Sequence, residues 1–282
     1  MIKQCIIFAL YVLSSSALLA TDSKQATDTT PTEDLKTYQA YFQKRFPNVS
    51  LQEYANGVYA IDAIARDNWQ AIEEFPPYEP MVEEGETLWQ TPFANGKTYA
   101  DCFDNDPAQR QHYPRWDAAS QQVLTLPLAI NNCRTAQGEK PLKYKKGTMA
   151  KLLAYMSHAS RGQTIAVAIP NAAALKAYND GKGLYFARRG QLNFSCASCH
   201  MQSAGQQVRT DVLSPAIGHT TGWPVYRSKW GNLGTLHRRF GGCMKQMRAK
   251  PYKAQSVEFR NLEYFLSHMS NGIQHNGPSA RK

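Results

Sequence analysis

Residues 196–200 read Cys-Ala-Ser-Cys-His, and this short motif constrains the chain more than any other segment. Two thiols at this spacing can form thioethers with the two vinyl groups of one haem, and the adjoining histidine then lies under the iron. A zinc site would need a second ligand pair at similar spacing, which the sequence lacks. The motif therefore predicts one covalent haem c on Cys196 and Cys199, with His200 as an axial ligand. The alternative is a redox-active cysteine pair that a histidine happens to follow.

The segments on both sides of the motif agree with a haem-binding domain. Residues 172–189 form a helix-like stretch with apolar side chains available for an inner face. Residues 256–269 carry apolar side chains at helical spacing. Small cytochromes c place one helix just before the haem motif and another at the end of the domain, so we expect both segments to be helices.

The two ends of the chain have polar or signal-like patterns. Residues 1–20 combine a positive charge at Lys3 with an apolar run and small residues, which is typical of a secretory signal peptide. No other long apolar run follows, so we expect a periplasmic protein without a membrane span in its mature form. Residues 21–49 are expected to be a flexible leader, and residues 273–282 a loose tail.

The composition fits a globular exported protein with anionic partners. Apolar residues make up 43% and charged residues 19% of the 282 positions, which is enough for a sizeable core. The formal net charge of +10 favours anions. Nucleic acid is not expected, because the chain is exported and lacks a basic helix or an aromatic-basic motif.

An internal repeat divides the chain into two copies. Residues 125–162 align without a gap to residues 235–272, with matches that include a cysteine, a Lys-Pro pair and a Ser-His pair. A period of 110 residues points to a duplicated domain and not to a solenoid. The predicted fold is mostly α-helical, with two tandem cytochrome c-like domains over 50–165 and 172–272, called here the N-terminal and the C-terminal copy.

The N-terminal copy lacks the residues that hold a haem. When Cys102 is aligned with Cys196, Asn105 and Asp106 stand where the second thiol and the axial histidine would be. This copy is therefore expected to carry no haem. Its two cysteines, Cys102 and Cys133, are most simply paired as a disulfide, which would stabilise the domain by roughly 3–4 kcal/mol in the chain-entropy model.

Cys243 remains without a partner in this assignment, which in an exported protein indicates a reactive thiol. Arg238 and Arg239 precede it and would favour the thiolate or hold an oxyanion. Gly241 and Gly242 leave room for an approaching group. The corresponding cysteine of the N-terminal copy is preceded by no arginine, so a purely structural role does not explain the difference.

These residues resemble the SoxA family. The resemblance covers about residues 50–275 and is most specific in the haem motif and in the segments HRRFGGC (237–243), RAKPY (248–252) and SVEFRNLEYFL (256–266). It implies a periplasmic L-cysteine S-thiosulfotransferase that works with a small haem subunit, SoxX. The activity implied is the oxidative joining of thiosulfate to a cysteine of the carrier SoxYZ, with electrons passing to the SoxX haem.

The resemblance also assigns roles by position. It implies that Cys243 binds the haem iron and carries a persulfide, that Arg239 lies on the substrate side, and that His200 is the proximal ligand. From its place beside Arg239, we expect Arg238 to help to hold the sulfonate group. The absence of a first C-x-x-C-H motif places the chain with the one-haem members, in which a disulfide takes that position.

Two rival functions stay open from the residues. Met244 and Met247 also lie at a suitable distance after the haem motif to be the distal ligand, as in a plain electron-transfer cytochrome c. A carrier-independent thiosulfate dehydrogenase, which would make tetrathionate, is the other alternative.

Overall fold

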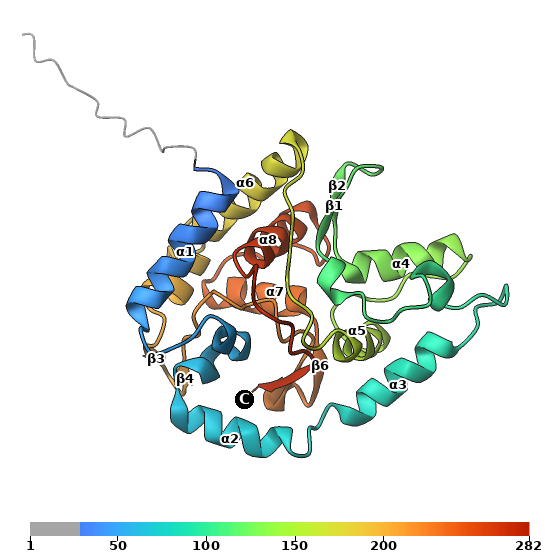
Figure 1. Cartoon of the computed structure of the whole chain (residues 1–282), viewed down its shortest axis with the longest axis horizontal. Coiled ribbons are helices and arrows are strands. Elements are labelled where there is room, and N and C mark those ends of the chain that lie inside the picture. The colour runs from blue at the N-terminus through green and yellow to red at the C-terminus, as the bar shows by residue number, and fades with distance from the viewer. Residues whose placement is uncertain (1–28, 282) are drawn as a thin grey trace, which may run out of the picture.

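The protein, described here by a computed structural model over residues 29–281, is mostly α-helical, as the sequence predicts (Figure 1). The predicted signal peptide and residues 21–28 of the leader lie outside this range. No helix within it is both long and apolar enough to cross a membrane. The helices of two turns or more are α1 Pro31–Arg45, α2 Ala63–Glu73, α3 Glu79–Gln90, α4 Leu126–Ala136, α5 Thr148–Ala159, α6 Ala172–Phe186, α7 Leu236–Gln246, α8 Val257–His268 and the 3-10 segment η1 Gln52–Ala60.

Short elements connect these helices. Single helical turns are η2 Ala100–Cys102, η3 Arg110–His112, η4 Ser198–Gln202 and η5 Ser228–Trp230. The strands are β1 Arg115–Asp117, β2 Gln122–Leu124, β3 Gln207–Val208, β4 Asp211–Val212, β5 Val225–Arg227, β6 Asn232–Gly234 and β7 Ser279–Arg281. They form antiparallel hairpins β1–β2, β3–β4 and β5–β6, and β7 joins β5 in parallel.

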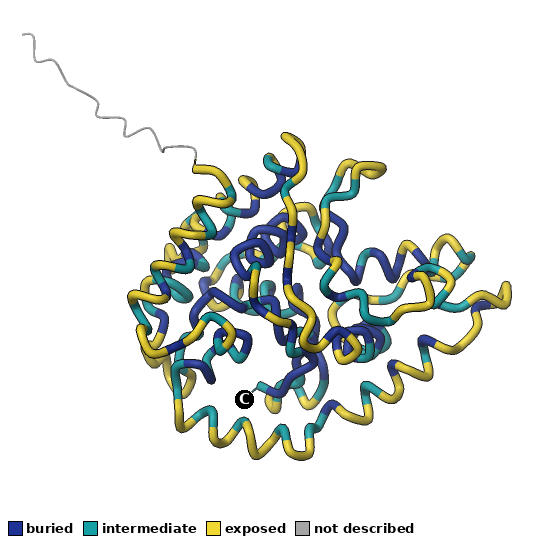
Figure 2. Tube along the Cα trace, in the orientation of Figure 1, coloured by how far each residue is buried: buried dark blue, intermediate teal, exposed yellow. Residues whose placement is uncertain are grey.

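Each copy is built on a pair of crossing helices with a glycine at the crossing point. In the C-terminal copy, a Cβ added to Gly181 of α6 would lie 2.0 Å from the backbone oxygen of Asn261 in α8. In the N-terminal copy, a Cβ on Gly85 of α3 would lie 2.2 Å from the backbone oxygen of Lys151 in α5. The same close packing in both pairs agrees with the duplication. Figure 2 shows α8 as the buried centre of the molecule, with buried residues along most of its length.

The two copies exchange their hairpins. Val123 of β2 belongs to the hydrophobic core of the C-terminal copy, where β2 contacts α6 and α8. Leu233 of β6 packs in return with Ala150 and Ala154 of α5. Because each hairpin packs on the helices of the other copy, the N-terminal copy helps to position the hairpin β5–β6 that leads into α7.

Polar contacts join the copies at equivalent positions of the repeat. The hydroxyl of Thr125 donates to the side-chain oxygen of Gln255 at 2.6 Å. The hydroxyl of Thr235, the counterpart of Thr125 in the repeat, donates to the backbone oxygen of Tyr144 at 2.9 Å. The two copies are therefore related by an approximate twofold arrangement in which each threonine contacts the other copy.

The expectation of a flexible leader over 21–49 is wrong from Pro31 to Arg45, which form α1. Thr30 and Glu33 form a capping box at its N-terminus, and Pro31 occupies the first helical position. Tyr38 and Phe42 are buried in the core of the C-terminal copy. An apolar face of this size stabilises a helix that local sequence alone would leave marginal.

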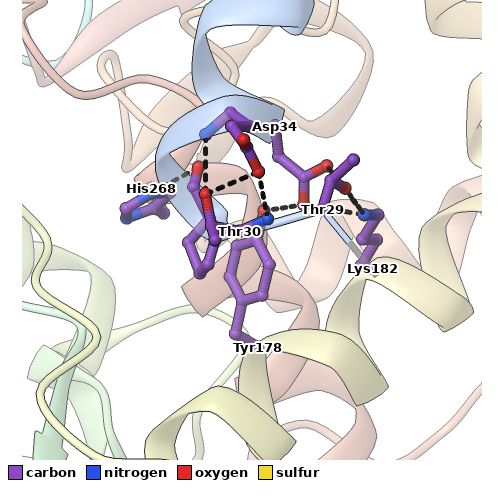
Figure 3. Close-up of polar contacts among 8 residues, drawn as sticks. Thr29, Thr30, Asp34, Tyr178, Lys182 and His268 are labelled. Carbon is purple, nitrogen blue, oxygen red and sulfur yellow. Dashed lines mark hydrogen bonds and ion pairs between the residues drawn. The ribbon is translucent and has the colours of Figure 1, made fainter. Parts of the chain in front are cut away.

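Charged and polar contacts at the start of α1 hold it to the C-terminal copy (Figure 3). Lys182 of α6 lies 2.7 Å from the carboxylate of Asp34, and the Tyr178 hydroxyl donates to the same carboxylate at 2.7 Å. His268 of α8 has one ring nitrogen 3.2 Å from the backbone oxygen of Pro31. These contacts explain why a polar segment, read as flexible from its composition, is ordered.

The expectation of a loose tail over 273–282 is also wrong for the residues that the structure describes. Ser279 to Arg281 form β7, in register with Val225 to Arg227. Ala280 is buried, and its N–H donates to the side chain of Glu73 in α2 at 2.8 Å. Arg281 lies over the ring of Tyr59, with 4.9 Å to the ring centroid.

Candidate functional site

The two haem-motif thiols lie in one helical turn. Cys196 begins the turn that continues into η4, and Ser195 caps it, because its hydroxyl accepts from the N–H of Ser198 at 3.0 Å. Residues three apart in a helix share a face, so Cys196 and Cys199 point to the same side. This is the arrangement that two thioether bonds to one haem require.

His200 is oriented for iron by its second ring nitrogen. Its Nδ1 lies 2.9 Å from the backbone oxygen of Ser214. A carbonyl oxygen only accepts, so Nδ1 carries the proton and Nε2 keeps a free lone pair. The ring of His219 packs edge-on against His200, with 4.4 Å between the ring centroids. The chain therefore fixes both the tautomer and the orientation that an axial ligand needs.

Cys243 lies in α7 with an ionisable thiol. Burial raises its pKa, but the positive charge of Arg239 and the interaction with the neighbouring His200 ring outweigh burial and lower the pKa to about 7. Burial raises the pKa of Cys196 to about 12, and the neighbouring Cys243 adds to that rise. The three free cysteines of the described range thus lie close enough to influence one another, and Cys243 is the one whose thiolate is favoured near neutral pH.

The residues present fit a haem c. A pair of thiols, an imidazole with a free Nε2 and a thiolate beside it are a suitable donor set. The lining is apolar, since Cys196, Met201 and Phe240 pack against the buried core of the C-terminal copy. Met244 and Met247 are both buried in that same core.

The structure brings Arg239 towards Cys243 and keeps Arg238 away. Arg239 precedes Cys243 by one helical turn, so the two share a face of α7. Arg238 lies instead over the ring of Trp230, with 4.0 Å from its Cζ to the ring centroid, and donates weakly to the backbone oxygen of Leu233. Arg227, which the sequence analysis did not single out, acts on both Cys243 and Arg239 through its charge.

In the N-terminal copy, aromatic side chains fill the interior. Cys102 and Cys133 form a disulfide, the pair proposed from the sequence. Asp106, at the position of the axial histidine, accepts from the N–H of Ala108 at 2.8 Å and so shapes a turn. The buried aromatic residues around the disulfide are Trp89, Phe93, Tyr99, Phe103 and Tyr113.

A buried charge network connects α7 to the N-terminal copy. Glu263 of α8 lies 3.0 Å from Nε2 of His237 at the start of α7, and 3.6 Å from Nη1 of Arg110 in η3. The N–H of Gln255 donates to Nδ1 of His237 at 3.0 Å, so Nε2 carries a proton towards Glu263. This network fixes the start of the helix that carries Arg239 and Cys243.

Comparisons with known proteins match both copies. The family model described as "SoxA/TsdA, cytochrome c domain" matches residues 84–165 and 180–274. A relative in Allochromatium vinosum, the "L-cysteine S-thiosulfotransferase subunit SoxA", is 61% identical over 258 residues, 91% of this chain and 92% of that protein. The protein of the same name in Chlorobaculum tepidum is 51% identical over 249 residues, 88% of this chain and 87% of the relative.

A solved structure has the same fold. The crystal structure of SoxXA from P. pantotrophus matches with a TM-score of 0.70 and 31% sequence identity. The match covers 78% of this chain and 84% of the other. The similarity therefore extends beyond the haem motif to both copies.

Proposed function

Because this chain belongs to the SoxA family of L-cysteine S-thiosulfotransferase subunits, we propose that it joins thiosulfate oxidatively to a cysteine of a carrier protein, with Cys243 as the reacting residue. The observation that carries the proposal is the position of Cys243. Its thiolate is favoured, it lies beside His200 and Cys196, and it is one helical turn from a guanidinium that can hold an anion. The plain electron-transfer alternative would not need that guanidinium.

The net reaction forms one sulfur–sulfur bond. The carrier thiol and the terminal sulfur of thiosulfate combine, the thiol proton is released, and two electrons leave. Haem c, when bound at Cys196 and Cys199, supplies a one-electron acceptor, and the haem of a SoxX partner subunit is the proposed second acceptor. One haem is proposed for this chain, since the N-terminal copy has a disulfide in place of the haem thiols.

The residues of the chain bind and orient the reactants. Arg239 holds the sulfonate group through its planar fork of N–H donors, which matches an oxyanion better than an ammonium would. The sulfur of Cys243, proposed to carry an extra sulfur atom as a persulfide, mediates the bond between thiosulfate and the carrier thiol. A Cβ built on Gly242 would meet no other described segment of the chain within 4 Å, so α7 is open at the residue next to Cys243, and this is where a carrier peptide is proposed to approach.

The proposed assembly is a heterodimer with SoxX in the periplasm. The name of the matched structure, SoxXA, and the subunit names of the relatives support the SoxX partner. The carrier SoxYZ and thiosulfate complete the proposed set of partners. The signal-like residues 1–20 support export.

The test is a Cys243→Ser variant assayed in the haem-loaded heterodimer with thiosulfate and the carrier. We expect carrier modification and electron release to be abolished, because a hydroxyl replaces the reactive sulfur. Lys245→Gln is the matched control, since it changes an exposed residue of the same helix. Full activity of the serine variant would contradict the proposal. Formation of tetrathionate without carrier would instead favour a thiosulfate dehydrogenase.

The distal ligand is tested by spectroscopy on the same samples. Wild-type protein is expected to show a thiolate-type paramagnetic resonance signal that the Cys243→Ser variant loses. A methionine–iron absorption band in the wild type would point to Met244 or Met247 and to a plain electron-transfer cytochrome.

A further inference from the structure

We propose that Arg227 is the second guanidinium of the substrate subsite, so that the sulfonate of thiosulfate lies between Arg227 and Arg239 beside the sulfur of Cys243. This inference rests on the proposed function and names a binding residue for it. It also replaces Arg238, the helper suggested by sequence adjacency, with a residue from a different element.

Arg227 is placed at the site by a rigid hairpin. It is the last residue of β5, opposite Asn232 of β6 and in register with Arg281 of β7. Its guanidinium lies 5.5 Å from the ring centroid of Trp230, at the turn of the same hairpin. Because β6 packs on α5 of the N-terminal copy, the position of Arg227 depends on the whole fold and not on a free loop.

Neither Arg227 nor Arg239 forms an ion pair with a carboxylate of the described residues. Within residues 29–281, no carboxylate oxygen lies within 4.0 Å of either guanidinium, and neither donates a side-chain hydrogen bond. The Nε of Arg227 is buried and has no hydrogen-bond partner in the part of the chain that the structure describes. Leaving a partly buried cation without hydrogen bonds costs free energy, so a bound oxyanion is the simplest completion of this site.

The two cations also repel each other when the site is empty of anion. The pKa of Arg227 is lowered by burial first and by the charge of Arg239 second. The charge of Asp211 and, after it, that of the Cys243 thiolate oppose this lowering of the pKa only in part. A dianion with three sulfonate oxygens would neutralise both guanidinium groups and accept donors from each.

The guanidinium of Arg238 stacks on Trp230 and is not part of the proposed subsite. Its Cζ lies 4.0 Å from the centroid of Trp230, and a Cβ built on Gly234 would lie 2.4 Å from that ring and 2.9 Å from Cδ of Arg238. The absence of a side chain at Gly234 therefore lets Arg238 and Trp230 stack closely. This stacking orients Trp230, which in turn contacts Arg227.

The repeat provides an internal comparison for Arg227. The residue 110 positions earlier is Asp117, which has the same place at the end of β1 opposite Gln122. Asp117 accepts a hydrogen bond from the N–H of Ser120 at 3.0 Å, and this contact stabilises the turn between β1 and β2. A hairpin of this geometry thus forms with an acidic residue at this position. The cation of the C-terminal copy therefore needs another explanation, which anion binding supplies.

The carboxylates of the haem are the other source of oxyanion oxygens for Arg227, and the experiment separates the two. The variants are Arg227→Gln, Arg227→Lys and the control Lys229→Gln, which removes the same charge from an exposed position of the same hairpin. Each is prepared as the haem-loaded heterodimer. KM for thiosulfate is measured with the carrier, and the dissociation constants of thiosulfate and sulfate are measured by calorimetry without it.

We expect Arg227→Gln to raise both KM and the dissociation constant of thiosulfate by about 10- to 100-fold, as for a lost charge-assisted hydrogen bond. Arg227→Lys should lie between this variant and the wild type, and Lys229→Gln should stay within about 2-fold of the wild type because exposed charges are screened. If Arg227→Gln matches Lys229→Gln in both constants, the proposal is wrong.

A second result would also overturn it. If Arg227→Gln leaves thiosulfate binding intact but shifts the midpoint potential and its dependence on pH, then Arg227 serves the haem carboxylates. The calorimetric measurement of thiosulfate binding needs no turnover. It therefore still decides the role of Arg227 if the wild type binds thiosulfate but does not modify a carrier. Binding of thiosulfate without modification of a carrier would contradict the proposed function but not the anion subsite.

Discussion

Arg110 of the N-terminal copy and Glu263 of the C-terminal copy lie 3.6 Å apart with side chains that are 5% and 3% exposed. Arg110 also donates to the backbone oxygen of Thr220 at 3.2 Å, so it reaches into the C-terminal copy with two contacts. The other carboxylate oxygen of Glu263 lies 3.0 Å from Nε2 of His237. Arg110, which belongs to the copy that lacks the haem motif, therefore completes the buried charge network at the start of α7.

We expect Arg110→Met to lower the free energy of unfolding by about 3 kcal/mol or more, because it leaves the buried carboxylate of Glu263 without its main counter-charge. Denaturant unfolding measures this. Lys176→Met is the control, since Lys176 pairs with Asp180 at 2.9 Å on the exposed face of α6 and should cost less than about 1 kcal/mol. Equal losses for the two variants would contradict the assigned role of Arg110.

The crossing of α6 and α8 leads to a second prediction. Gly181→Ala should lower the free energy of unfolding by about 2 kcal/mol or more, because the new Cβ would lie 2.0 Å from the Asn261 backbone oxygen and must push the helices apart. Gly183→Ala, two residues along the same helix, meets no described atom within 4 Å and should be neutral or stabilising by about 0.5 kcal/mol. Thermal unfolding of both variants decides the matter, and a stable Gly181→Ala would refute the close crossing.

The haem motif and the repeat could be predicted because both depend on spacing along the chain. The alignment of Cys102 with Cys196 rests on the residues themselves, so the loss of haem ligands in the N-terminal copy follows without a structure. The start of α1 also had a local signal, since Thr30, Pro31 and Glu33 form a standard helix start. The polar composition of residues 21–34 outweighed that signal in the prediction of a flexible leader.

Other features depend on contacts between distant segments. Arg227 belongs to strand β5 and Arg239 to helix α7. Their relative position depends on how the exchanged hairpin packs on the other copy. From the sequence, Arg239 is expected to be the substrate-side arginine and Arg238 its helper, but Arg238 stacks on Trp230, a contact that sequence adjacency does not reveal. The strand β7 forms only because β5 offers it an edge, and nothing in the short tail itself predicts that pairing.

The disulfide of the N-terminal copy gives a third prediction. Replacing both Cys102 and Cys133 by alanine should lower the free energy of unfolding by about 3–4 kcal/mol, because the loop between them is no longer closed in the unfolded chain. Denaturant unfolding with and without a reductant tests this. Reductant should destabilise the wild type to a similar extent and leave the double variant unchanged. A reductant effect of the same size on both proteins would refute the assignment.

Acid sensitivity of the fold is the fourth prediction, and it centres on His275. This residue is 3% exposed, and neither ring nitrogen has a hydrogen-bond partner among the described residues. Burial and, secondarily, the charge of Arg110 lower its pKa to about 3, and the nearby backbone of Thr221 offsets this only slightly. The unfolded chain therefore binds a proton below its ordinary pKa of about 6.5, while the folded protein does not, so stability is lost as the pH falls from 6.5 towards 3.

By this linkage, His275 should account for a loss of about 2 kcal/mol between pH 7 and pH 5. The variant His275→Leu cannot take up that proton, so its free energy of unfolding should fall by about 2 kcal/mol less over the same interval. His112→Leu is the control, because the side chain of His112 is exposed and its replacement should leave the wild-type pH dependence in place. If His275→Leu and the wild type lose the same stability on acidification, then His275 is protonated in the folded protein and the acid sensitivity has another origin.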